Sequence, residues 1–171
     1  MVQLRPYRLE DFDVVRRWID DPATLGPEPF RQPRRSNADV RRLVSGDGEP
    51  GMARFAVVVD DRLVGEVQYR HGERGLPPGV FEIGIAIWDP ADRGKGYGRD
   101  AQRQLVNRLF RDHGARRVQA GTSPQNDAER RCLGALGFVE EGTLRRLMDV
   151  ENGRGDIVVY GLLKEEWNAW T

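Results

Sequence analysis

The sequence predicts an α/β fold with a mixed sheet, and the prediction rests on three observations. Apolar residues recur with a period of two in some runs and at helical spacing in others. Strand-like and helical runs alternate through the middle of the chain, as in α/β proteins. Near the C-terminal end two strand-like runs follow one another across Asn152-Gly153, a turn typical of hairpins, so part of the sheet is expected to be antiparallel.

Length and composition favour one soluble globular domain over residues 1–171. The 27 basic and 27 acidic residues balance, so no global charge indicates a nucleic-acid partner. No run approaches the length of a membrane span and the N-terminus lacks a signal peptide, which predicts a cytoplasmic protein. The single cysteine, Cys132, excludes an internal disulfide, and His71 and His113 form no metal-ligand cluster.

The chain begins with a predicted strand and helix. Residues 2–8 alternate apolar and polar, and Pro6 places this strand at an edge of the sheet. Apolar residues at helical spacing follow from Glu10, and Asp21-Pro22 ends that helix.

The segment 22–51 differs in composition, because it holds five of the ten prolines and a cluster of arginines. Asn37 is expected to cap a short helix within it. The arginines favour either a solvated face or a basic lip on a substrate cleft. They are Arg31, Arg34, Arg35, Arg41 and Arg42.

A hairpin is predicted over residues 53–69, where two β-rich runs are separated by Asp60-Asp61-Arg62. A loop rich in glycine and proline follows over 71–79. The run Val80 to Trp88 is almost entirely apolar and predicts a strand buried on both faces. Gly84 within it indicates a bulge or the close approach of a ligand.

The stretch Arg93-Gly94-Lys95-Gly96-Tyr97-Gly98-Arg99 follows this strand and opens a helix that continues to about Asp112. Glycine tolerates positive φ, and a helix N-terminus offers unpaired N–H groups, so the stretch predicts a phosphate seat. It is not a P-loop, because no Ser or Thr follows Lys95, and its G-x-G-x-G spacing is not that of a dinucleotide site. A basic turn without a ligand is the alternative.

The remaining elements are a strand over 116–121, a helix over 127–136 and strands over 137–139 and 157–163. Thr122 and Ser123 precede the helix and are expected to cap it, or to bond a ligand.

On these residues the chain resembles the GNAT superfamily of acyl-CoA-dependent N-acyltransferases. The family signature R/Q-x-x-G-x-G/A is met by Arg93 to Gly98, and the segment from Asn126 to Leu136-Gly137-Phe138 resembles the family's N-x-x-[AS]…L-G-F. The two ends, 4–11 and 155–167, look like the branch of ribosomal-protein N-terminal acetyltransferases and their small-molecule relatives. The resemblance covers nearly the whole chain.

The resemblance implies a mostly antiparallel central sheet that splays at a cofactor cleft, with helices on both faces. It implies acetyl-CoA as cosubstrate, an amine acceptor (a protein N-terminus or a small molecule) and, by analogy, a homodimer to which Trp167 and Trp170 contribute. By position, the cofactor would contact the backbone of Ala86, Ile87 and Trp88, the loop residues Arg93, Gly94, Lys95, Gly96, Tyr97, Gly98 and Arg99, and Asn126.

The acceptor amine is cationic at neutral pH and must lose a proton before it attacks. Glu82 is the candidate base, because it is the only acid within the run 80–88; the alternative is an exposed strand start. Many relatives carry a tyrosine that protonates the thiolate, but Leu133 occupies that position here. A non-catalytic acyl-CoA-binding module and a polyamine- or antibiotic-acetylating enzyme are the rival functions, and the basic segment disfavours a polycationic acceptor.

Overall fold

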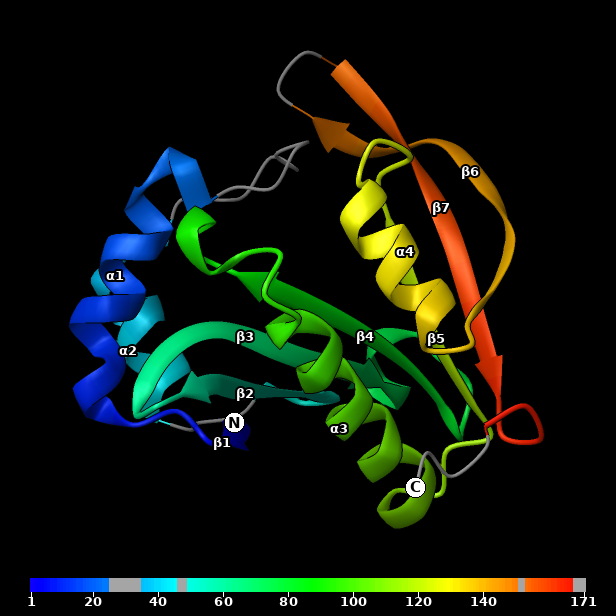
Figure 1. Ribbon diagram of the computed structural model, residues 1–171, viewed down its shortest axis with the longest axis horizontal. Coiled ribbons are helices and arrows are strands. Elements are labelled where there is room, and N and C mark those ends of the chain that lie inside the picture. The colour runs from blue at the N-terminus through cyan, green and yellow to red at the C-terminus, as the bar shows by residue number, and fades with distance from the viewer. Residues whose placement is uncertain (25–34, 46–48, 151–152, 168–171) are drawn as a thin grey trace.

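The computed structural model describes residues 1–24, 35–45, 49–150 and 153–167, and these form one seven-stranded sheet with helices on both faces (Figure 1). The strand order is β1-β2-β3-β4-β5-β7-β6. The strands are β1 (Val2–Arg5), β2 (Met52–Val59), β3 (Arg62–His71), β4 (Val80–Ile87), β5 (Arg117–Thr122), β6 (Val139–Val150) and β7 (Gly153–Leu163). The α-helices are α1 (Phe12–Asp20), α2 (Asn37–Ser45), α3 (Tyr97–Asp112) and α4 (Asp127–Ala135).

Strand pairing confirms the mixed, mostly antiparallel sheet. Only the β4–β5 pair is parallel, and its ladder covers just Val80–Ile83 against Arg117–Ala120. Beyond that point the two halves of the sheet diverge (Figure 1), as the predicted splay requires. The rest of β4, from Gly84 to Ile87, therefore has a paired neighbour only in β3.

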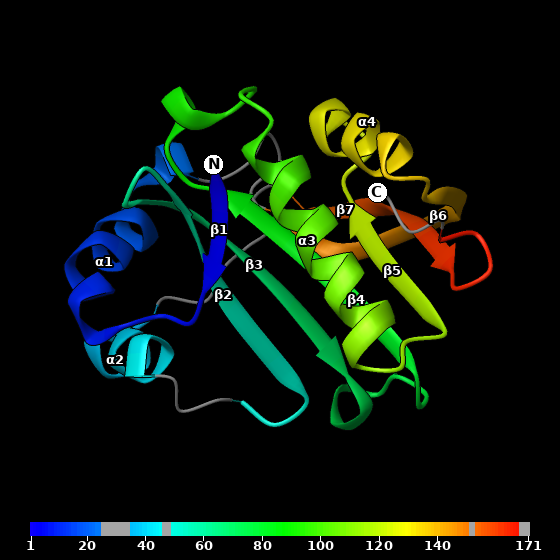
Figure 2. The same cartoon turned by 60° about the horizontal axis from the view of Figure 1, so that its bottom comes forward.

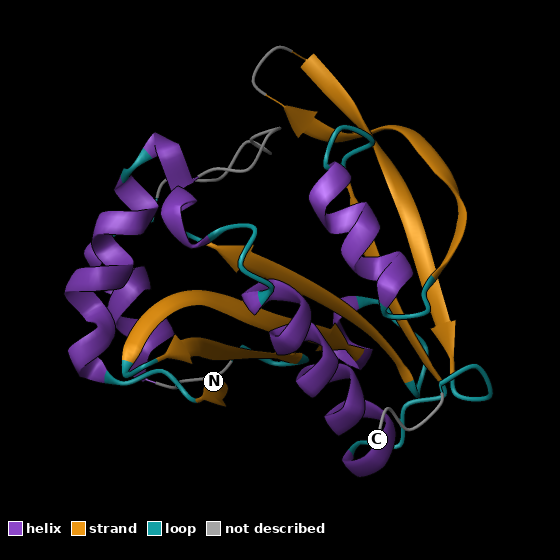
Figure 3. Cartoon of the chain, viewed as in Figure 1, coloured by secondary structure: helices purple, strands orange, loops and turns teal. Residues whose placement is uncertain are grey.

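Alternation along β2 explains why helices lie on both faces of the sheet (Figures 2 and 3). Val57 and Val59 belong to the main core beneath α3 and α4, whereas Ala56 and Val58 pack against α1 and α2. Successive strand side chains point to opposite faces, so an unbroken valine run can serve two cores. The α1–α2 layer covers only the β1–β2 side, which leaves polar side chains from β3, β4 and β5 on the same face.

Two of the predicted turns and caps have a clear physical basis. Asp60 and Asp61 join β2 to β3 with φ of 48° and 60°, the left-handed pair of a tight hairpin turn. The predicted cap of α2 was off by one residue: Ser36, not Asn37, accepts from the N–H of Asp39, and Asp39 accepts from the N–H of Ser36. This reciprocal pair is a capping box, with an aspartate in place of the usual glutamate.

The sequence interpretation of β4 was wrong in two respects. Phe81 and Ile83 are buried beneath α3, but Ala86 is exposed, so the strand is not buried on both faces. Gly84 pairs with Gln68 within an uninterrupted register, so it forms no bulge. Among the described residues, no helix covers the second face of β4 at Gly84 and Ala86.

The C-terminal tail contributes to the core. Trp167 stacks on Phe110 with ring centroids 5.2 Å apart and donates from Nε1 to Asn107 at 3.0 Å. This packing corrects the expectation of an exposed Trp167 at a dimer interface; Trp170 lies outside the described residues. No helix within the described ranges is long and apolar enough to cross a membrane.

Candidate functional site

The glycine-rich loop presents backbone N–H groups at the start of α3. Gly94 and Gly96 adopt φ of 75° and 86°, a region in which a side chain is strained. Gly96 is the N-cap residue, so no side chain caps the helix. The first N–H groups of α3 are therefore available to an anion, and the helix dipole favours negative charge there.

Asp92 anchors this loop to the sheet. Its carboxylate, 3% exposed, accepts from both Nη atoms of Arg62 at 2.7 and 2.8 Å and from Lys95 Nζ at 3.1 Å. The hydrogen bonds from Arg62 are the main reason why the pKa of Asp92 is lowered to about 2. The carboxylate is thus ionised at neutral pH and fixes the loop to the first residue of β3.

The Arg93 side chain does not turn toward the loop N–H groups. Its Nε donates to the carbonyl of Ile87 at 3.0 Å, and its Nη2 contacts the carbonyls of Trp88, Thr24 and Ala23. Four carbonyls thus contact the guanidinium, and the predicted contact of Arg93 with the cofactor stays a prediction.

Arg99, in contrast, is an exposed cation in the first turn of α3, and within the described ranges it has no ion-pair partner. Lys95 forms an ion pair with Asp92, and its Nζ lies 6.0 Å from the centre of the Tyr97 ring. Of the predicted phosphate-binding side chains, Arg99 is therefore the one whose charge is uncommitted.

Backbone alternation decides which part of β4 can bind an extended ligand. Trp88 N–H donates to the Val64 carbonyl at 3.2 Å, and the Ala86 carbonyl points toward Gly65 of β3. In an antiparallel ladder such groups alternate, so Ile85 and Ile87 direct their N–H groups to the other side, where β5 has diverged. Of the residues predicted to contact the cofactor, Ile87 directs its N–H to this free side, whereas Ala86 and Trp88 face β3; Ile85, which was not predicted, also directs its N–H to the free side.

Glu82 lies one residue before the point where β4 and β5 separate. Its carboxylate forms an ion pair with Arg70 of β3 and accepts from Gln119 Nε2 of β5 at 3.1 Å. The side chain is 23% exposed, so it is neither a solvated strand start nor buried. It faces the open side of the sheet, the same side as Gly84 and Ala86.

The open face carries further paired charges. Glu66 accepts from Arg54 at 2.6 Å and from Tyr7 Oη at 2.9 Å. Burial raises the pKa of Tyr7 well above its usual value, so the phenol is neutral and donates. Arg117 binds Glu141 through two hydrogen bonds of 2.7 and 2.5 Å. With Glu82 and Arg70, three acid–arginine pairs line this face, and their charges balance.

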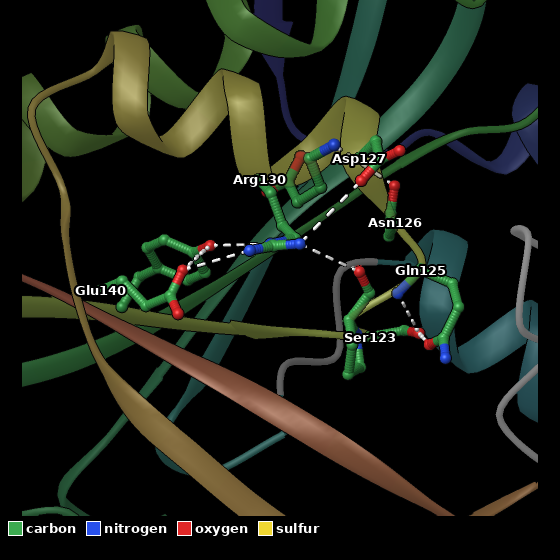
Figure 4. Close-up of polar contacts among 9 residues, drawn as sticks. Ser123, Gln125, Asn126, Asp127, Arg130 and Glu140 are labelled. Carbon is green, nitrogen blue, oxygen red and sulfur yellow. Dashed lines mark hydrogen bonds and ion pairs between the residues drawn. The ribbon is translucent and has the colours of Figure 1, made fainter.

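Across the splay from β4, the start of α4 has its own polar network (Figure 4). Asn126 caps the helix by accepting from Glu129 N–H at 3.2 Å, so Asn126 has the capping role predicted for Thr122 and Ser123. Ser123 is buried and bonded to Gln125. Arg130 of α4 donates to Glu140 and to the carbonyl of Pro124, and so links α4 to β6 and to the turn before the helix.

The helix α4 offers no acid for a leaving thiolate at the family position. Leu133 is fully buried in the core. Burial raises the pKa of its neighbour Cys132 to about 12, so little thiolate forms at neutral pH, and the half-buried side chain packs against the main core. Among the described residues no group of histidine, cysteine and acidic side chains could hold a metal ion.

Sequence reasoning missed the partners of Glu82. Arg70 and Gln119 lie on other strands, 12 and 37 residues away in the chain, so only the strand register brings them together. The alternation that favours Ile85 over Ala86 could have been found, once the pairing of β4 with β3 was assumed.

Comparison with known proteins assigns the family. Residues 2–139 match the acetyltransferase (GNAT) domain family. The uncharacterized N-acetyltransferase p20 of Bacillus licheniformis is 27% identical, over 96% of this chain and 93% of its own. A putative acetyltransferase from T. thermophilus superposes with a TM-score of 0.74 at 29% identity, covering 97% of this chain and 87% of that one. RimJ of Mycobacterium smegmatis, solved in complex with CoA-disulfide, shares the fold with a TM-score of 0.82 at 24% identity, over 96% and 83% of the two chains.

Proposed function

This chain belongs to the GNAT acetyltransferase family and is an acetyl-CoA-dependent N-acetyltransferase, and we propose that Glu82 is the base that prepares its acceptor amine. The observation that carries the proposal is the position of Glu82 at the vertex of the splay. The N–H groups at the start of α3, which we propose bind the phosphates, follow the C-terminal end of β4, whereas Glu82 lies near its N-terminal end. The strand β4 therefore holds the cofactor site and the base at a fixed separation.

We propose that acetyl-CoA lies along the free edge of β4. Its pyrophosphate would accept from the first N–H groups of α3, with Arg99 supplying charge. Its pantetheine arm would add to the sheet at Ile85 and Ile87 as a further strand does. The thioester then reaches the vertex, because the β4–β5 ladder blocks further entry at Ile83.

In this arrangement the amine nitrogen attacks the thioester carbonyl carbon from the open face of the sheet. Glu82 accepts the proton that the ammonium form must lose, directly or through water. The C–S bond then breaks, the acetyl group stays on nitrogen, and this nitrogen releases its second proton to solvent. Because Leu133 cannot donate, we propose that the thiolate of coenzyme A takes its proton from solvent.

The acceptor we propose is a single amine, such as a protein N-terminus or a small monoamine. Glu82 and Glu141 on the open face, and the buried Glu66 of the neighbouring strand, are each paired with an arginine, so these acids of the described residues offer no surplus negative charge to a polycation. The cationic groups of a polyamine or aminoglycoside would lose hydration there without an unpaired acid to replace it. We expect the segments 22–51 and 70–79 to select the acceptor.

A substitution of Glu82 by glutamine tests the base. Coenzyme A release is measured over a panel of peptides and small amines from pH 6 to 10. Glu82→Gln is expected to lower kcat by about 100-fold and to move the rising limb of the profile to higher pH, since only amine already deprotonated reacts. Glu141→Gln is the matched control, an acid paired with an arginine on the same face; equal losses in both variants would refute the assignment.

The rival function is a non-catalytic acyl-CoA-binding module, favoured only by Leu133. Tight binding of acetyl-CoA with no turnover on any amine would support that module. If the chain turns over and Glu82→Gln leaves the rate unchanged, the chain is an enzyme but Glu82 is not its base.

We also propose that the enzyme acts in the cytoplasm as a homodimer. The support is the edge strand β6, which carries Leu144 and Leu147 at 49% and 55% exposure. An exposed edge strand with apolar side chains favours pairing with another chain.

A further inference from the structure

The contacts of Arg93 join the donor loop, the glycine-rich stretch from Gly94 to Arg99, to the turn that follows α1. This turn is the 3-10 helix η2 (Pro22–Thr24). Arg93 Nη2 lies 2.9 Å from the Thr24 carbonyl and 3.3 Å from that of Ala23. Its Nε also donates to the last residue of β4, and its Nη2 to the residue that follows it. One side chain therefore bridges segments about 70 residues apart in sequence. In both views the end of β4 lies beside the C-terminal end of α1 (Figures 1 and 2).

A second contact holds the same two segments. Trp88, directly after β4, stacks on Trp18 of α1 with ring centroids 4.9 Å apart and planes at 22°. Thr24 Oγ1 in turn lies 2.7 Å from the Trp18 carbonyl, so the turn is fixed to the same helix. The end of β4, the last turn of α1 and η2 thus form one packed unit, and Arg93 is its polar link.

The chemistry of the side chain suits this link better than a phosphate site. A guanidinium presents several donors in a fixed plane and can satisfy carbonyls that converge from different segments. Ala23 and Thr24 follow the C-terminal end of α1, and a cation near a helix C-terminus is also favoured by the dipole. Turning Arg93 to a phosphate would break all four contacts.

We infer that Arg93 is a positioning residue that couples occupancy of the donor loop to the order of the acceptor-side turn η2. The inference rests on the proposed function, in which the loop from Gly94 to Arg99 binds the donor. Binding of the donor would fix the loop backbone, and Arg93 would transmit that restraint to Ala23 and Thr24. The acceptor-side segment would then be ordered before the amine arrives.

The test uses coenzyme A as the probe and needs no acceptor. Its affinity is measured by calorimetry for the wild type, Arg93→Ala, Arg93→Gln and Arg99→Ala. Hydrogen exchange is followed for residues 18–24 with and without coenzyme A. Thermal unfolding confirms that each variant is folded, and Arg93→Gln keeps two amide donors should the alanine variant be unstable.

In the wild type, coenzyme A is expected to slow exchange in both 18–24 and the first turn of α3. Arg93→Ala should keep its affinity within about threefold but lose the protection of 18–24, and Arg93→Gln should retain part of it. Arg99→Ala should lose about tenfold in affinity, as expected for one charge-assisted contact to phosphate. An affinity loss in Arg93→Ala as large as that in Arg99→Ala, or protection of 18–24 that is absent in the wild type or unchanged in Arg93→Ala, would overturn the inference.

Failure of this inference is distinct from failure of the catalytic proposal. The exchange and calorimetric readouts involve neither Glu82 nor turnover. If no variant binds coenzyme A at all, the donor seat itself is wrong, and with it the coupling that depends on the seat.

Discussion

Glu129 shows how one side chain can make the stability of this fold depend on pH. It lies in the first turn of α4 and accepts one hydrogen bond, from Gln102 Nε2 at 3.2 Å, while the Gln102 Oε1 atom is buried with no partner. Burial raises the pKa of Glu129 to about 7, because one neutral donor does not replace the hydration of a carboxylate. The folded state therefore prefers the protonated form.

The sign of the effect follows from linkage. A carboxyl whose folded-state pKa is raised gives its full stability below about pH 4.5 and loses it as pH rises through about 7. Glu129→Gln should remove this loss, so the variant is expected to be more stable than the wild type by about 1–3 kcal/mol at pH 8 and nearly equal at pH 5. Urea denaturation at both pH values checks this, with the exposed Glu140→Gln as control; a constant difference across pH would contradict it.

At the scale of elements, the junction between β4 and α3 forms the proposed cofactor site. The glycine loop lets the chain reverse from the sheet into the helix, and Asp92 fastens it through Arg62. A Cβ added to Gly98 would meet Ile85 and Ile87 at 3.7 Å, an ordinary contact. The protein itself therefore tolerates a small side chain at this position of the first turn.

This tolerance makes Gly98 a clean probe of the donor seat. Gly98→Asp places a negative charge beside the N–H groups that would receive phosphate, so the affinity for coenzyme A should fall by at least about 100-fold. Gly134→Asp, on the exposed side of α4, provides the matched control and should leave affinity unchanged. Calorimetry measures both, and unaltered binding in Gly98→Asp would remove the loop from the cofactor site.

At the scale of the whole molecule, the two edges of the sheet differ. The β1 edge is only four residues long, whereas β6 is a 12-residue edge strand with Leu144 and Leu147 exposed. Long apolar edges are rarely left unpaired in soluble proteins. The net charge of zero gives little repulsion between copies, so association of two chains along β6 is favoured.

Light scattering coupled to size exclusion tests this association. The wild type is expected at twice the mass of the chain, and a Leu144→Lys/Leu147→Lys variant at the mass of one chain, because lysines block edge pairing. Leu9→Lys, which replaces another exposed leucine far from β6 in the chain, should stay dimeric. A wild type that elutes as one chain at all concentrations would reject the dimer.

The sequence by itself determined the elements and the donor loop, since these depend on local rules. Periodicity located the strands and helices, and three glycines at the start of a helix predicted an anion-binding site, for which Gly94 and Gly96 have the positive φ expected. The resemblance to the family implied the splay of the sheet. Exact positions within elements were predicted less well: the N-cap of α2 is Ser36, whereas Asn37 was predicted.

Only the tertiary structure decided which groups face which partner. Arg93 belongs to the signature, yet its carbonyl partners at Ala23 and Thr24 come from a distant turn that no local pattern predicts. Likewise, the pairing of β4 with β3 directs the backbone of Ala86 to β3 and leaves the N–H groups of Ile85 and Ile87 on the other side, and the register alone places Arg70 and Gln119 against Glu82. The physical reason is that hydrogen-bond direction and charge pairing depend on neighbouring strands, whereas propensity and spacing belong to a single segment.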